Sequence, residues 1–425
     1  MLLAQNSTIE NFNNQGTIQG PQVGIETGAT INTFTNNGLI NSPGRGEWSN
    51  GIWMSANSNI QTFTNTGTIE GGGSGIRMAG GTIGTLTNSG SIQGKYGGGI
   101  RVTNRATINQ IDNSGIINGL NTWQGAISIS DWYSRLTVHT IKNSGTLTGG
   151  TGIDILHADI DLIENSGTII GTVNSTTDAG IQLHSSSVGT IINSGYIKSK
   201  SYGIQLATES QNTTLNNLIN SGTIEGDLDG LLLTQKTNLK TIENTGVIKG
   251  GNAGINIHII DFNWGKNGTV GTIVNKGSGE IVGNNYGIII PTSSADYTVE
   301  AVKIESGKVE GTNGAGIALG ADQDISTSIE ISGENTVVTG GQAGIVNEGN
   351  LGANGSGGIT ISNGATITSN SGNGSGIVNQ GNGSISGSIT VSNGASIEGG
   401  ITNTGSGSIT GSITVSGTSS IEGGV

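Results

Sequence analysis

Few residues in this sequence are of types that could perform acid–base chemistry or bind a metal, and only one group of them is dense. His157, one of 4 histidines in 425 residues, lies among Asp154, Asp159 and Asp161. A histidine surrounded by carboxylates could hold a divalent metal or transfer a proton. The aspartates alternate with branched aliphatic residues, however, as they would on the solvent-exposed face of a strand. We therefore expect no metal site, no cofactor and no catalytic centre here.

Paired carboxylates on adjacent strands would instead indicate an enzyme that cleaves or eliminates sugars, with carboxyl groups about 5 to 10 Å apart. The outward positions of the repeated Gly-Ile strands described below are Trp53, Arg77, Arg101, Ser128, Asp154, Gln182, Gln205, Leu232, Asn256 and Ile289. No two neighbouring positions are both acidic. This absence of acidic pairs makes a polysaccharide-processing enzyme an alternative and not the favoured interpretation. The release of reducing ends from polysaccharides would test it.

Binding to ice is a third alternative, because it requires flat arrays of Thr-x-Thr pairs. Three successive repeats hold such pairs, at Thr33/Thr35, Thr62/Thr64 and Thr85/Thr87. The equivalent places in the next three repeats are Gln110/Asp112, Thr140/Lys142 and Leu162/Glu164. Three pairs form a poor plane, so ice binding is not favoured.

The composition excludes several partners. The net charge is −13, and the 16 basic residues are scattered, which argues against a nucleic-acid partner. With no cysteine there is no disulfide or thiolate metal site. No apolar run approaches the ~20 residues that cross a bilayer, so we expect no membrane insertion by this segment. The opening five residues are too few for a signal peptide, and we expect a fragment of a longer protein.

One pattern organises the first 250 residues: Asn, any residue, Gly, any residue, then Ile or Leu. Ten copies recur with an average period of about 26 residues, which is the sequence signature of a stacked repeat. They begin at Asn14, Asn36, Asn65, Asn88, Asn113, Asn143, Asn165, Asn193, Asn220 and Asn244.

Each period contains three short strands. One strand lies in the Asn pattern itself. A second is the alternating apolar run that follows a glycine, as at residues 152–155, and a third precedes the Asn, as at residues 30–34. Ile31 and Phe34 can both face inward only if the chain turns a corner between them. We expect stacked coils with ladders of β-branched residues inside. We also expect an Asn ladder at one corner, and a positive φ at the glycine two residues later.

The pattern predicts a parallel β-helix of about 16 coils. Residues 1–350 would form coils with variable loops. From residue 351 the loops shorten, and the run at residues 383–392 returns 24 residues later. We expect residues 351–425 to continue the same β-helix, in coils rich in Gly, Ser, Thr and Asn.

Runs such as residues 165–169 and 220–226, each followed by Gly-Ile, resemble the passenger domains of Gram-negative autotransporters. The resemblance covers nearly the whole chain. It implies a right-handed β-helix that is exported through the periplasm and the outer membrane to the cell surface or the medium. Protease-type passengers carry a serine nucleophile, but no Gly-Asp-Ser-Gly-like run is present here. The resemblance thus implies a non-catalytic adhesin or structural passenger; a vacuolating-toxin-like passenger is the alternative.

Aromatic residues in the loops are the candidate ligand-binding residues. Several lie just before a Gly-Ile strand, and since every coil turns the same corner, they would line one edge and contact a cell-surface glycan or protein of host or bacterium. Alternatively, each ring covers its own loop, or the rings serve self-association. The candidates are Trp48, Tyr96, Trp123, Trp132, Tyr133, Tyr202, Trp264 and Tyr286.

Overall fold

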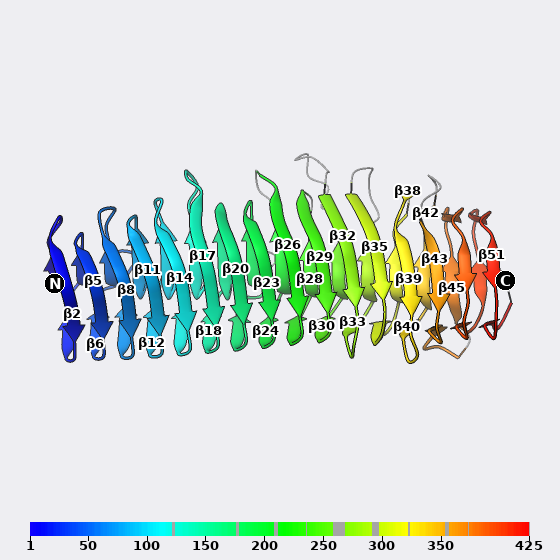
Figure 1. The fold of residues 1–425 in the computed structure, drawn as a ribbon, viewed down its shortest axis with the longest axis horizontal. Coiled ribbons are helices and arrows are strands. Elements are labelled where there is room, and N and C mark those ends of the chain that lie inside the picture. Colours follow the sequence, from blue (N-terminus) through cyan, green and yellow to red (C-terminus); the bar gives the residue numbers. More distant parts are fainter. Residues whose placement is uncertain are drawn as a thin grey trace. The chain divides into compact units, whose positions relative to one another are not determined.

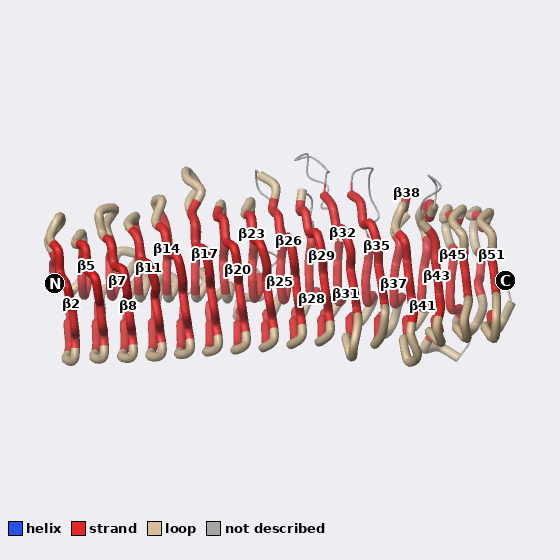
Figure 2. The backbone as a smooth tube through the Cα atoms, viewed as in Figure 1, coloured by secondary structure: helices blue, strands red, loops and turns tan. Residues whose placement is uncertain are grey.

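The computed structural model describes residues 1–120, 124–175, 178–207, 211–234, 236–257, 268–290, 297–321, 324–352, 357–372 and 374–424. Within these ranges the chain forms strands, turns and loops and no helix (Figure 2). Accordingly, the described residues include no helix that could cross a membrane. The chain divides into two compact units, Met1–Gln205 and Leu206–Val425, and each is described by itself.

The first unit contains three parallel sheets, and every coil contributes one strand to each (Figure 1). Sheet A contains β1 (Leu2–Leu3), β4 (Val23–Thr27), β7 (Asn50–Met54), β10 (Ile76–Ala79), β13 (Ile100–Thr103), β16 (Ile127–Ser130), β19 (Ile153–Leu156) and β22 (Ala179–His184). Sheet B contains β2 (Thr8–Asn14), β5 (Thr30–Asn36), β8 (Asn59–Asn65), β11 (Thr82–Asn88), β14 (Thr107–Asn113), β17 (Leu136–Asn143), β20 (Ala158–Asn165) and β23 (Ser187–Asn193). Sheet C contains β3 (Thr17–Gln19), β6 (Leu39–Ser42), β9 (Thr68–Gly71), β12 (Ser91–Gly94), β15 (Ile116–Gly119), β18 (Thr146–Gly149), β21 (Thr168–Gly171) and β24 (Tyr196–Ser199). The unit boundary falls within β25 (Tyr202–Ala207).

The second unit repeats this arrangement. Its sheet A contains β28 (Asp229–Leu233), β31 (Ala253–Ile257), β34 (Tyr286–Ile290), β37 (Ala315–Leu319), β41 (Ala343–Asn347), β45 (Ser375–Asn379) and β49 (Ile401–Asn403). Its sheet B contains β26 (Thr213–Asn220), β29 (Thr237–Asn244), β32 (Gly268–Asn275), β35 (Tyr297–Ile304), β39 (Ser328–Ser332), β43 (Gly358–Ser362), β47 (Ile389–Val391) and β51 (Ile413–Val415). Its sheet C contains β27 (Thr223–Gly226), β30 (Val247–Gly250), β33 (Glu280–Gly283), β36 (Lys308–Gly311), β40 (Val337–Gly340), β44 (Thr366–Ser369), β48 (Ser396–Ile397) and β52 (Ser420–Ile421).

The predicted all-β parallel solenoid with three strands per coil is confirmed, and each of its three main sheets has 16 strands in the described residues. The strands shorten toward the end of the second unit, where β46 to β52 have only two or three residues. A fourth parallel sheet, which the sequence analysis missed, begins ahead of residue 351. It contains β38 (Asp324–Ile325), β42 (Asn350–Leu351), β46 (Ser384–Ile385) and β50 (Ser408–Ile409).

Inward-facing residues form ladders in register. Ile169 is fully buried between Leu147 and Ile197, its partners on the two adjacent strands. In sheet B, Ile31 and Phe34 are both buried, as expected. The corner between them is a bend within β5, since the register passes over Asn32 in both neighbouring pairings. A coil that could not bury its own apolar face is thus covered by the next.

The predicted asparagine ladder is present at the turn between sheets B and C. In each coil of the first unit the amide nitrogen donates to the amide oxygen of the next Asn. Asn14 donates to Asn36, and Asn36 to Asn65, both at 2.7 Å. The ladder reaches Asn193, which accepts from Asn165 at 2.8 Å. These side chains are buried, so the ladder satisfies polar groups that water cannot reach.

The sequence predicted a positive φ at the glycine of this turn, and this prediction is wrong for the turns from Gly16 to Gly246. The positive-φ glycines of the described residues include none of the turn glycines from Gly16 to Gly246. Glycine is required there for a steric reason, because a Cβ at Gly38 would collide with the carbonyl oxygen of Gly16 in the coil below. The later turns between sheets B and C do have a glycine with positive φ, from 63° at Gly277 and 79° at Gly307 to 103° at Gly333.

The glycine that precedes most sheet A isoleucines is also explained by close packing. A Cβ on Gly51 would lie 2.7 Å from the carbonyl oxygen of Gly75 and 2.8 Å from Cγ2 of Ile69 on sheet C. Sheets A and C therefore approach so closely at this point that no side chain fits between them.

The face assignment predicts opposite outcomes for two adjacent substitutions. Ile169→Asp would place a charge in the apolar ladder and should lower the free energy of unfolding by several kcal/mol, roughly 3 to 5. Thr168→Asp, on the partly exposed face, should cost less than about 1 kcal/mol. Urea unfolding followed by circular dichroism measures both, and equal losses would refute the assignment.

The asparagine ladder predicts different losses of stability for a second pair of adjacent substitutions. Asn143 donates to Asn165 Oδ1 at 2.8 Å and to the Gly145 carbonyl at 3.2 Å, and accepts from Asn113 at 2.8 Å. Asn143→Leu removes these bonds and leaves the buried amide oxygen of Asn165 without its ladder donor, which should cost roughly 2 to 4 kcal/mol. The control is Ser144→Ala, which removes one bond of 3.4 Å and should have little effect. A Leu variant as stable as the control would show that the ladder contributes nothing.

Candidate functional site

A group of interacting aromatic and charged side chains lies on the outer face of sheet A in the first unit. Trp53, Arg77 and Arg101 occupy the same outward position on β7, β10 and β13, and each pairs in register with the next. Their inward neighbours along the strands are all buried: an isoleucine before each, and Met54, Met78 or Val102 after it. The outward column written from the sequence is therefore correct at these positions.

A loop residue completes this group. Trp48, between β6 and β7, lies with its ring centroid 4.5 Å from the guanidinium carbon of Arg77 and 5.9 Å from the ring of Trp53. The backbone carbonyl of Glu47 accepts a hydrogen bond from Arg77 at 3.2 Å. Arg77 is only 9% exposed, whereas Trp48 is 61% exposed. We call Glu47, Trp48, Trp53, Arg77 and Arg101 the Trp48 cluster.

Arg77 fixes the position of the Trp48 ring. A guanidinium against an aromatic face contributes about 1 to 2 kcal/mol when it is partly desolvated. Burial lowers the pKa of Arg77, the adjacent Arg101 lowers it further, and Glu47 opposes both. Because arginine remains charged even so, the buried guanidinium holds the indole in place while the outer face of the ring remains open to solvent.

Tyr96 belongs to the same edge of the first unit. The loops that lead into sheet A stack on one another: the Gly72 N–H donates to the Ser42 carbonyl at 2.8 Å, and the Tyr96 N–H donates to the Gly72 carbonyl at 2.9 Å. Tyr96 is also an exposed side chain. The backbone therefore places the Trp48 and Tyr96 loops on one edge.

The other aromatic candidates lie elsewhere. Trp132 and Tyr133 are exposed but lie at a different corner, between β16 and β17. Tyr202 is half-buried at the start of β25, and Tyr286 packs on an apolar cluster in the second unit. Trp123 and Trp264 lie outside the described residues. Tyr286 thus packs against side chains of the following coils in the second unit.

Sequence reasoning did not single out four members of the Trp48 cluster: Glu47, Trp53, Arg77 and Arg101. The last three were placed in the outward column, but that column was inspected only for paired acids. The useful signal was a tryptophan and two arginines in successive coils beside a loop that contains another tryptophan.

The group around His157 does not converge on one point. Asp159 accepts two bonds of 2.8 Å from Arg135 Nε, and Asp161 bonds to His139 at 2.7 Å. Nδ1 of His157 lies 3.0 Å from the backbone carbonyl of Asp131. In the part of the chain that the structure describes, no group of three or more His, Asp or Glu side chains could hold a metal.

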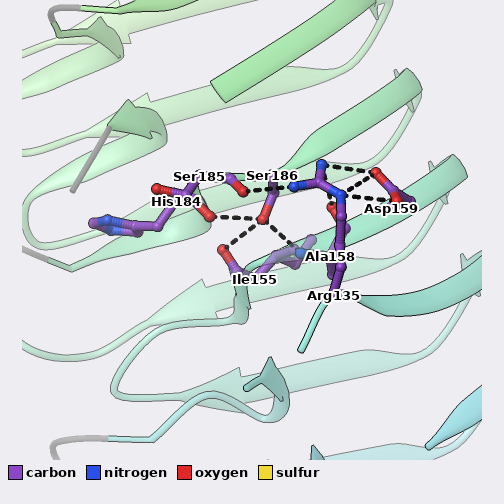
Figure 3. A network of polar contacts seen from close by, with 7 residues as sticks. All are labelled: Arg135, Ile155, Ala158, Asp159, His184, Ser185 and Ser186. Atoms are coloured by element: carbon purple, nitrogen blue, oxygen red, sulfur yellow. Dashed lines mark hydrogen bonds and ion pairs between the residues drawn. The ribbon is translucent and has the colours of Figure 1, made fainter. Parts of the chain in front are cut away.

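Arg135 instead connects successive coils (Figure 3). Besides its ion pair with Asp159 on β20, it donates to the Ser185 carbonyl at 3.2 Å, one coil further on. Ser186 Oγ donates to the His184 carbonyl at 2.7 Å and accepts from the Ala158 N–H at 3.1 Å. This network stabilises the corner between sheets A and B.

His184, at the same corner, makes the free energy of unfolding of the first unit depend on pH. Burial, with a smaller contribution from the nearby His157, lowers the pKa of His184 to about 4. Below about pH 6.5 the unfolded chain binds a proton that the folded chain does not bind until about pH 4. The free energy of unfolding should therefore fall as the pH drops through this range, by at most about 3 kcal/mol. Above about pH 6.5 this contribution is constant.

Urea unfolding of the parent and of His184→Gln from pH 7 to pH 4 tests this. The variant should show a shallower decline over this range. Identical pH slopes in the two proteins would exclude His184 as the source.

The fold and the cluster together define the class of protein: a repetitive, all-β parallel β-solenoid with an aromatic and cationic group on its outer face. No family model, curated protein or solved structure matches this chain. What the chain does must therefore be argued from its own surface.

Proposed function

We propose that this chain is a non-catalytic adhesive passenger, displayed at the cell surface or secreted by a Gram-negative autotransporter, which binds cell-surface ligands through the Trp48 cluster. The observation that carries the proposal is the exposed Trp48 ring, held at 4.5 Å over the buried Arg77. An exposed indole that is already fixed loses little conformational entropy when a ligand binds it. Such preorganised aromatic residues are typical of binding surfaces.

The organisation of the coils also supports this proposal. The interior is filled by apolar ladders, so a ligand must bind from outside. Loops of variable length precede sheet A, and they can differ between coils without changing the register of the sheets. β-Helical passengers combine such a scaffold with surface loops, which agrees with the resemblance of the repeat.

The experiment compares the parent chain with Trp48→Ala in adherence to host and bacterial cells and in binding to a glycan array. Removal of the central ring should lower the affinity at least about tenfold, as for other preorganised aromatic anchors. The control is Ile219→Ala, which removes an exposed apolar side chain from the second unit and should bind like the parent. Circular dichroism should be the same for all three proteins.

Two outcomes would contradict the proposal. Undiminished binding by Trp48→Ala would place the adhesive surface elsewhere on the chain. Absence of binding by the parent to any cell or glycan would leave the solenoid as a scaffold only.

A further inference from the structure

The Trp48 cluster carries an excess of positive charge, although the whole chain has a net charge of −13. Arg77 and Arg101 occupy paired positions on adjacent strands, and within the cluster only Glu47 is acidic. Arg77 donates to the backbone carbonyl of Glu47, while the Glu47 carboxylate lies 3.5 Å from NH1 of Arg101. The Glu47 carboxylate thus pairs with Arg101 alone, and Arg77 binds the Glu47 backbone.

The ion pair between Arg101 and Glu47 is weak. Its length of 3.5 Å is beyond that of a good charge-assisted hydrogen bond, which is about 2.7 to 2.9 Å. The Glu47 side chain is largely exposed, and such surface pairs contribute only about 0 to 1 kcal/mol. A ligand anion that reached Arg101 in bidentate geometry would therefore displace Glu47 at little cost.

The two positions that flank Arg101 in the column hold no acid, and the acids of this column lie further away, at Asp154 two strands on and Glu26 three strands back. The following position is Ser128, which is buried and accepts a hydrogen bond from the Gly125 N–H at 3.0 Å. Asp154 is one strand further on. On the other side Arg77 is buried beneath Trp48, so Arg101 is the guanidinium of this pair that a ligand can contact.

We propose that the Trp48 cluster binds an acidic saccharide, with a sugar ring stacked on Trp48 and its carboxylate or sulfate group paired with Arg101. This inference rests on the proposed adhesive function and names the ligand class of the same site. Trp48 provides the apolar face, Arg101 provides the charge, and Arg77 is a positioning residue that holds the Trp48 ring. A neutral sugar could use the ring but would gain nothing from Arg101.

Isothermal titration calorimetry with three oligosaccharides of equal length tests the inference. An oligogalacturonate supplies carboxylates, a heparin-derived oligosaccharide supplies sulfates with carboxylates, and a malto-oligosaccharide is neutral. The acidic ligands should bind, with affinity that falls as salt is added, and the neutral ligand should bind at least tenfold more weakly. The two acidic arms show whether the carboxylate or the sulfate is recognised.

Three variants separate the roles. Arg101→Gln should lower affinity for the acidic ligand at least tenfold, because it removes the charge. Glu47→Gln should raise that affinity, because it removes the competing carboxylate. Lys240→Gln, an equal loss of charge at an exposed site in the second unit, should bind like the parent. Circular dichroism confirms the fold of each variant.

The outcomes distinguish failure of this inference from failure of the adhesive function. Binding to cells or neutral glycans that is lost in Trp48→Ala but kept in Arg101→Gln would overturn the acidic ligand and retain the adhesin. Equal losses in Arg101→Gln and Lys240→Gln would reduce the effect to overall charge and overturn the specific site. No binding of any saccharide or cell by the parent would overturn both proposals.

Discussion

The asparagine ladder sets the constraint on which the first unit depends. Each ladder bond requires the same side chain at the same height in the next coil, and the turn glycine permits the coils to approach that closely. Both conditions hold from Asn14 to Asn193. Together they fix the register of sheets B and C, so every buried isoleucine meets another buried aliphatic side chain. The packing of the core therefore depends on the asparagine and the glycine of this turn.

Residues outside the ladders are free to differ. Loop lengths before sheet A change from coil to coil, and the outward column changes from Trp53 and Arg77 to Ser128 and Gln182 without altering the strands. The Trp48 cluster arises where one of these loops folds over the column. Its chemistry thus requires coils in register and one loop that returns to the sheet.

Much of the fold could be predicted from the sequence because the ladders repeat visibly. The Thr33, Thr62 and Thr85 column, the burial of Ile169 and the Asn ladder all follow from spacing. The Trp48 cluster could not be predicted in this way, since nothing periodic indicates that Trp48 folds over Arg77 rather than into solvent. The role of the turn glycines was misjudged for a related reason: the collision that excludes a side chain there comes from another coil. The fourth sheet was hidden because its strands have only two residues each. A further asparagine ladder in the second unit, in which Asn347 donates to Asn379 at 2.7 Å and Asn379 to Asn403 at 2.6 Å, was missed as well.

The asparagine ladder also has a direction. Every bond of the first unit runs from an amide nitrogen to the amide oxygen of a later coil, so the amide dipoles add head to tail, as peptide dipoles do in a helix. Aligned hydrogen bonds polarise one another and strengthen together. An interruption at the midpoint would leave two short, weaker chains of dipoles, whereas one at the end would only shorten the chain. The ladder at this turn therefore forms a chain of aligned dipoles that strengthen one another, in addition to setting the spacing of the coils.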